Sequence, residues 1–133
     1  MDVGHFKPQV FPHRIPDEGI YLILYNPYKY TLSDILINPN TELHGGFADM
    51  IDYEEKQEKI SVSILYPYQA YDKVYKLNID KDFGEENFFI RWRYGYYNLK
   101  VKWKRDVKVH FTLEYTDEND KPFYFNNLKN FEV

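Results

Sequence analysis

The sequence predicts an all-β fold, a single antiparallel β-sandwich of about seven or eight strands. Short segments of alternating apolar and polar residues recur along the chain, and turn residues such as Gly, Pro, Asn and Asp separate them. Aromatic residues make up 20% of the chain, and these side chains favour the pleated surface of a sheet. The pattern shows no long helical period and no internal repeat. A flattened barrel is the alternative with the same strand pattern.

A chain of 133 residues has the usual length of one domain, and we expect this domain to span residues 19–133. Pro8, Pro12 and Pro16 recur every four residues before it, and each lacks a backbone donor and favours extended geometry. We therefore expect residues 1–18 to form an extended arm or edge segment. The chain contains no cysteine, which excludes disulfides and thiolate chemistry. Without a long apolar run or a signal-like N-terminus, we expect a soluble protein, cytoplasmic or secreted, whose compartment stays open.

Three segments of the first half have the pattern of strands. Ile20–Tyr25 is a continuous apolar run that ends at the turn signal Asn26–Pro27, and Thr31–Ile37 is the second candidate. Lys59–Tyr66 alternates apolar with polar residues, which is typical of a half-buried strand. Leu43–Gln57 fits neither period well and has room for one short helix.

The alternation is clearest in the second half of the chain. An acidic turn, Asp80–Glu86, separates the first predicted strand there from the next three. Two-residue connections link those three strands and favour hairpins, so we expect a C-terminal three-strand meander. The predicted strands of this half are Tyr75–Ile79, Phe88–Tyr94, Tyr97–Trp103, Val107–Tyr115 and Pro122–Phe125.

The polar positions of the meander are mostly basic, and strand alternation places them on one outward face. Residues 87–113 hold seven Lys and Arg against one acidic residue, a net charge of +6, whereas the rest of the chain carries -10. This asymmetry indicates an anion-binding surface, and a solvated face protected from aggregation by Lys is the alternative. The candidate residues of this basic face are Arg91, Arg93, Lys100, Lys102, Lys104, Lys108 and His110.

Tyrosines form a second candidate surface, because many of them fall at predicted strand ends and turns. Amphipathic rings on loops stack on sugars, lie at membrane interfaces or anchor protein partners. The alternative is that most of the tyrosines cap the core of a small sandwich. We select Tyr28, Tyr68 and Tyr96, one from each turn, as candidate ligand-binding residues.

Several partners are compatible with this charge distribution. They are phosphate headgroups in peripheral contact with a membrane, a sulfated glycan, an acidic protein, or the acidic part of a second copy of the chain in a homo-oligomer. Nucleic acid is not favoured, because the chain carries a net charge of -4 and has no nucleic-acid-binding motif.

No motif points to a metal, a cofactor or a catalytic centre. The four histidines are scattered, so we expect no zinc site. His44-Gly45-Gly46-Phe47 is similar to the oxyanion loop of α/β-hydrolases, but the nucleophile elbow is absent, and we interpret the segment as a loop with two glycines. Four carboxylates within Asp80–Glu86 leave a Ca²⁺ site open, although their spacing does not match an EF-hand loop.

The run Leu22–Asn26, followed by Thr31–Ile37 and Leu43–Phe47, resembles the opening of the aegerolysin family. The strands Phe88–Tyr97 and Val109–Tyr115 follow in the order of that family. Aegerolysins are small, acidic, aromatic-rich β-sandwiches that bind membrane lipids and often act with a larger pore-forming or insecticidal partner. The resemblance therefore implies a lipid-binding β-sandwich, and it assigns no functional residue.

These observations favour a non-enzymatic binding protein that recognises an anionic, lipid or glycan surface through the basic face and the turn tyrosines. A membrane-binding toxin component is one form of this function. The second interpretation is a protein–protein interaction module, such as an inhibitor, an immunity-type antidote or an assembly subunit. A small hydrolase is the third interpretation. It ranks last because no nucleophile–base pair or metal site can be assembled from the sequence.

Overall fold

The computed structural model describes residues 6–39, 59–125 and 130–132, and this part of the chain contains β-strands and no helix. The strands are β1 (Gln9–Ile15), β2 (Gly19–Tyr25), β3 (Leu32–Pro39), β4 (Ile60–Leu65), β5 (Ala70–Lys76), β6 (Phe83–Trp92), β7 (Gly95–Arg105), β8 (Val109–Asp117), β9 (Pro122–Phe123) and β10 (Asn130–Glu132). The short helix considered for Leu43–Gln57 and the glycine pair of His44–Phe47 lie outside the described residues.

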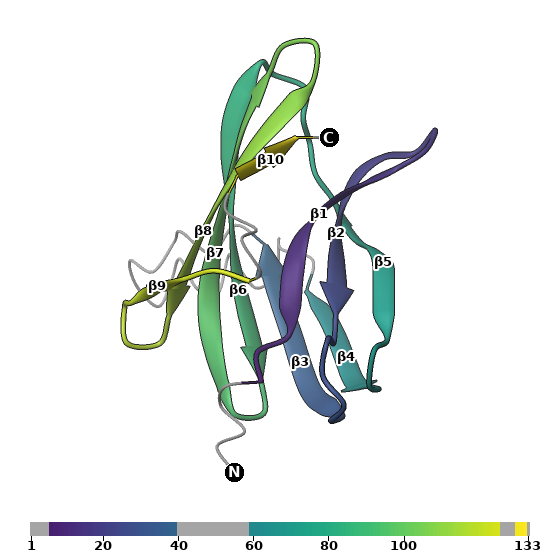
Figure 1. Ribbon diagram of the computed structural model, residues 1–133, viewed down its shortest axis with the longest axis vertical. Helices are drawn as coiled ribbons and strands as arrows, with labels where there is room; N and C mark the ends of the chain where they lie inside the picture. Colours follow the sequence, from purple (N-terminus) through teal and green to yellow (C-terminus); the bar gives the residue numbers. More distant parts are fainter. Residues whose placement is uncertain (1–5, 40–58, 126–129, 133) are drawn as a thin grey trace.

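The strands form two antiparallel sheets with the hydrophobic core between them (Figure 1). The smaller sheet has the order β1–β2–β5, and the larger has the order β10–β8–β7–β6–β3–β4, with β9 paired to β8. Each sheet runs from one edge to another, which confirms the predicted sandwich rather than the closed alternative. The neighbours β6, β7 and β8 are the predicted C-terminal meander.

The segment expected to be an extended arm or edge segment contributes β1, an edge strand of the smaller sheet. Gln9 to Ile15 pair with β2 in continuous register, and Val10 is fully buried. Pro12 has no N–H and cannot donate a hydrogen bond to β2. The backbone groups of the even-numbered residues of β1 point away from β2, toward the free edge of the sheet. The proline spacing therefore suits an edge strand that is paired on one side only.

Two buried tyrosines satisfy carbonyl groups on this free edge of β1. The Tyr97 hydroxyl donates to the Pro8 carbonyl at 2.6 Å, and the Tyr115 hydroxyl donates to the Val10 carbonyl at 2.7 Å. Both rings belong to the larger sheet, so these hydrogen bonds cross the core and join the two sheets. Burial raises the pKa of both phenols above the usual value, mainly because it removes the charged phenolate from water.

The acidic turn predicted at Asp80–Glu86 is shorter than expected, because β6 begins at Phe83. Gly84 lies opposite Trp103, and a Cβ atom at Gly84 would lie 2.5 Å from the indole ring, so only glycine fits beneath that ring. Strand geometry then places Glu85 and Glu86 on opposite faces of β6. Glu86 accepts a hydrogen bond from the Tyr75 hydroxyl at 2.7 Å. Among the described residues, no three potential metal ligands lie close enough together to hold a metal ion.

The two buried tyrosines predict a loss of stability in alkali. The pKa of an unfolded tyrosine is about 10, and the pKa of both phenols is raised in the folded protein. Stability is therefore complete below about pH 10 and falls above it, by up to about 1.4 kcal/mol per pH unit for each tyrosine. Urea unfolding at pH 8, 10 and 11 measures this slope.

The variant Tyr115→Phe separates this effect from the titration of other groups. It should be less stable than the parent at pH 8 by about 1–3 kcal/mol, because the buried Val10 carbonyl loses its donor. Its stability should also fall less steeply above pH 10. An unchanged slope in the variant would show that Tyr115 ionises equally easily in the folded and unfolded states.

Candidate functional site

Basic residues of β7 share one outward face of the meander, but glutamates of the neighbouring strands lie among them. Lys100 is opposite Glu114, and Lys102 is opposite Glu85. The Lys102 ammonium lies 3.1 Å from Glu114, and the Lys100 ammonium lies 3.8 Å from Glu85. Glu85 and Glu114 fall just outside residues 87–113, so the net charge of +6 for that segment omits them. The middle of the basic face therefore alternates in charge.

Lys108 and His110, at one end of the basic face, also have acidic partners. The Lys108 ammonium lies 3.5 Å from Glu132, and the two ring nitrogens of His110 lie 3.1 Å from Asp106 and 3.3 Å from Glu132. Hydrogen bonds from the Lys108 backbone N–H and from His110 lower the pKa of the Asp106 carboxyl. Lys104 lies between Phe83 and His110 and has no ion pair with any residue that the structure describes.

Arg91 and Arg93 lie at the opposite end of this face, where the structure brings them together with turn tyrosines. Tyr96 is directly opposite Arg91, and the Arg93 guanidinium lies 5.7 Å from the centre of the Tyr94 ring. Within the described part of the chain, neither arginine forms an ion pair. The sequence-predicted site residues thus divide into a charge-alternating group and an arginine–tyrosine group.

Three loops meet at this end of the sandwich: residues 26–31, 66–69 and 93–94 (Figure 1). We call this surface the tyrosine end, and its members are Tyr28, Tyr30, Tyr66, Tyr68, Tyr71, Tyr94 and Tyr96. Tyr66, Tyr68 and Tyr94 are 59%, 63% and 51% exposed. Alternation alone had placed Tyr66 and Tyr94 on the apolar side of their strands, and the structure corrects this because both lie in the turns that follow.

A single buried asparagine joins two of these loops, and the sequence showed it only as a turn signal. The Asn26 amide donates to the carbonyl groups of Tyr30 at 2.7 Å, Leu65 at 3.1 Å and Tyr66 at 3.2 Å. Its side-chain oxygen accepts from the Tyr28 N–H at 3.0 Å. Asn26 is fully buried, so these partners replace all of its hydrogen bonds to water. The loop after β2 is therefore fixed to the turn between β4 and β5.

Tyr68 occupies a turn position that normally requires glycine. The Gln69 N–H donates to the Tyr66 carbonyl at 3.0 Å, Pro67 is the second residue of this turn, and Tyr68 has a φ of 60°. Proline followed by a residue of positive φ defines a type II turn. A left-handed conformation costs a residue with a Cβ atom about 1–2 kcal/mol. Because the Tyr68 side chain is mostly exposed, little packing within the fold offsets this cost.

Tyr28 differs from the exposed members of the tyrosine end. Its ring is half-buried and packs edge-on against Phe6, with 5.0 Å between the ring centres. Partial burial raises the pKa of the Tyr28 phenol. Tyr28 therefore serves partly in packing, whereas Tyr68 and Tyr96 present their rings to solvent.

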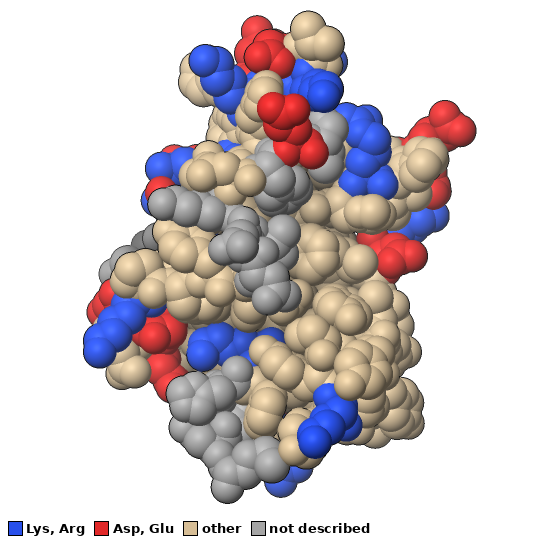
Figure 2. All heavy atoms as spheres, in the orientation of Figure 1, with Lys and Arg blue, Asp and Glu red and all other residues tan. Residues whose placement is uncertain are grey.

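Charged groups are distributed unevenly around the rest of the surface. Figure 2 shows that they gather at the end of the molecule that carries the turn between β7 and β8. The surface over the lower parts of β1, β2 and β5 is nearly free of them, in agreement with the uncharged sequence of β2. At the tyrosine end, the Lys29 ammonium lies 5.5 Å from the centre of the Tyr30 ring. Cations at this end thus lie beside aromatic rings.

No family model, curated protein or solved structure matched the chain. Among the described residues, no helix is long and apolar enough to cross a membrane. The functional assignment therefore depends on the geometry of the tyrosine end.

Replacing the buried asparagine predicts a large loss of stability. Asn26→Ala should lower the free energy of unfolding by about 2–4 kcal/mol, because the buried Leu65 carbonyl loses a donor and the Tyr28 N–H loses its acceptor. Urea unfolding measures the change. Asn98→Ala, on the outward face of β7, is the matched control and should change stability by less than about 0.5 kcal/mol. Equal effects of the two substitutions would contradict the role of Asn26.

Proposed function

We propose that this protein is a non-catalytic binding domain that attaches to a lipid headgroup surface through its tyrosine end. The conformation of Tyr68 carries this proposal. A bulky residue stands in a left-handed turn where glycine would be more stable, and its ring is exposed rather than packed. Local strain of this kind is concentrated at functional sites. The Tyr68 side chain is therefore retained for a contact outside the fold.

The composition of the tyrosine end favours a headgroup surface. Tyrosine is enriched at membrane interfaces, because its ring is apolar and its hydroxyl remains in contact with water and headgroups. The loops after β2, β4 and β6 lie at one end of the sandwich (Figure 1), so tyrosines from several of them can reach a single surface together. This arrangement provides one broad platform rather than an enclosed pocket.

Cations at the tyrosine end add attraction to phosphate groups. Arg91, Arg93 and Lys29 have no ion pair with any described residue, whereas Lys100 and Lys102 are paired with glutamates. An unpaired arginine can donate hydrogen bonds to a phosphate without first losing an internal partner. The arginines of the predicted basic face therefore support the proposal more strongly than its lysines do.

A protein partner is the second candidate for the same surface. Tyrosine and arginine are the residues enriched at the centres of protein–protein interfaces. The two candidates differ in what they require: a headgroup surface needs only lipid, and a protein partner would leave vesicles unbound.

The variant Tyr68→Gly tests the proposal with two readouts. It should raise the free energy of unfolding by about 1 kcal/mol, because glycine adopts the observed φ without strain. It should also weaken binding to phosphatidylcholine vesicles that contain phosphatidylserine by about tenfold, because the most exposed ring of the platform is lost. Urea unfolding and vesicle flotation measure the two effects.

Phe83→Ser is the matched control, because Phe83 is also an exposed aromatic residue and lies at the opposite end of β6. Vesicle binding should survive this substitution. If the parent protein does not float with these vesicles, the headgroup proposal is wrong and a protein partner becomes the better candidate. If Tyr68→Gly floats as well as the parent, the tyrosine end is not the binding surface.

A further inference from the structure

A cleft of about 400 Å³ opens at the end of the sandwich opposite to the tyrosine end. It lies between the tip of the β1–β2 hairpin and the turn that connects β7 to β8, where the two sheets diverge (Figure 1). Its volume falls within the range of roughly 300–1,000 Å³ that is usual for small-molecule sites. The cleft is separate from the tyrosine end.

The floor of the cleft is apolar. Ile20, Leu77 and Val109 are buried residues of the core that reach this end, and Ile79 lies beside them. At the rim, Val107 is 99% exposed, so an apolar side chain stands free at the entrance. A ligand that fits this cleft therefore carries an apolar part.

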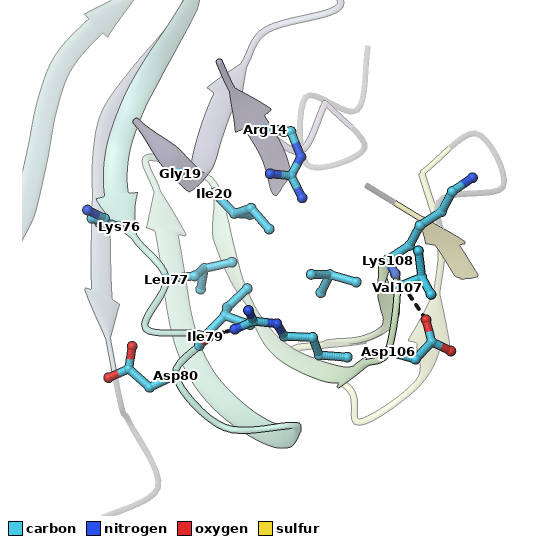
Figure 3. A pocket seen from close by; sticks show the side chains of 12 residues that line it. Arg14, Gly19, Ile20, Lys76, Leu77, Ile79, Asp80, Asp106, Val107 and Lys108 are labelled. Carbon is cyan, nitrogen blue, oxygen red and sulfur yellow. Dashed lines mark hydrogen bonds between the residues drawn. The ribbon is translucent and has the colours of Figure 1, made fainter. Parts of the chain in front are cut away.

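Arg14 places a positive charge above this apolar floor. It has the same parity on β1 as the buried Val10 and Pro12, so its side chain starts on the inner face of the smaller sheet. Figure 3 shows the Arg14 guanidinium directed into the cleft, toward Ile20. Arg14 has no ion pair or hydrogen bond with any residue in the described ranges. The Arg14 side chain is exposed, so its guanidinium is open to a ligand that enters the cleft.

Arg105 supplies a second guanidinium. Its side chain lines the cleft, and one of its N–H groups donates to the Ile79 carbonyl at 3.2 Å. A guanidinium has five N–H donors in a planar fork, so this single bond leaves donors for a ligand.

The other charged residues of the lining are directed elsewhere. Lys76 lies 6.0 Å from the centre of the Tyr21 ring on the outer face, and Lys108 is paired with Glu132. The Asp106 carboxylate accepts from the Lys108 N–H at 3.0 Å and lies 3.1 Å from His110, and the Asp80 side chain points away from the cleft (Figure 3). Arg14 and Arg105 therefore line the cleft without an acidic partner among the described residues.

We infer that this cleft binds an amphipathic carboxylate, with the carboxylate between Arg14 and Arg105 and the alkyl chain on Ile20, Leu77 and Ile79. The fork of an arginine matches the two oxygens of a carboxylate, and charge-assisted hydrogen bonds of this kind are the strong ones. The apolar floor gains from contact with the chain because both surfaces leave water. A free fatty acid of medium length has this chemistry.

Calorimetric titration of the full chain with decanoate, below its micelle concentration, tests the inference. Decanoate should bind at least about tenfold more tightly than acetate, which lacks the chain, and than decanol, which lacks the charge. Equal binding of decanol and decanoate would overturn the role of the arginines. Equal binding of acetate and decanoate would overturn the role of the apolar floor.

Two variants locate the site within the protein. Arg14→Gln should weaken decanoate binding by about tenfold, because it removes a charged donor, and Lys104→Gln, which removes a charge on the outward face of β7, should leave binding unchanged. Val107→Asp, at a fully solvent-exposed position, should also weaken binding by placing a negative charge at the entrance. Unchanged binding in both Arg14→Gln and Val107→Asp would show that decanoate binds elsewhere.

Discussion

The hydrogen bonds that Tyr97 and Tyr115 donate across the core determine the arrangement of both ends of the molecule. They fix β1 against the larger sheet, although β1 is an edge strand that pairs with β2 alone. Because side chains alternate along a strand, an inward Tyr97 makes its neighbour Tyr96 face outward at the tyrosine end. In the same way, an inward Val10 gives Arg14 the inner face at the cleft end. These two hydrogen bonds therefore fix which side chains face outward at the tyrosine end and which face inward at the cleft end.

Charge on a β-sheet depends on cross-strand neighbours rather than on segments of sequence. Residues 87–113 carry a net charge of +6, yet the register inserts Glu85 and Glu114 beside Lys100 and Lys102. Opposite charges at such positions contribute a few tenths of a kcal/mol to the sheet, and exposed pairs are worth at most about 1 kcal/mol. These lysines are therefore largely neutralised on their own face. Within the described ranges, the arginines near the turn form no ion pair, which shifts the candidate site toward the tyrosine end.

Alternation predicted the fold class, the meander and its core, because period two is a local property of a strand. Phe88, Ile90 and Leu99 are fully buried as the pattern required. Strand ends were less predictable: Val107 continues the apolar alternation but lies in the turn before β8 and is almost fully exposed. Turn geometry breaks the period without any change in composition, so the sequence pattern contains no mark of the boundary.

Contacts between loops were beyond the reach of local patterns. Pro27 indicated a turn, but nothing nearby in the sequence shows that the Asn26 side chain forms hydrogen bonds with the carbonyl groups of Leu65 and Tyr66, about forty residues away. The candidate residues Tyr28, Tyr68 and Tyr96 were selected from predicted turns. Tyr96 lies at the start of β7 instead, and only the antiparallel topology brings the three positions to one end. The cleft was not predicted at all, because Arg14 belongs to a segment whose pairing the prolines concealed.

Tyr68 and Arg14 are the described residues on which the two proposed sites depend. Tyr68 stands where glycine is preferred, and Arg14 occupies an inward-facing position without an acidic partner among the described residues. Natural sequences are otherwise consistent across local propensity, packing and charge, and exceptions concentrate at functional sites. Little packing within the fold offsets the backbone strain at Tyr68, because its ring is mostly exposed. The exposed Arg14 guanidinium keeps its donors available to water or to a ligand. We propose a contact outside the chain for each of them, a headgroup surface for the Tyr68 ring and a small carboxylate for the Arg14 guanidinium.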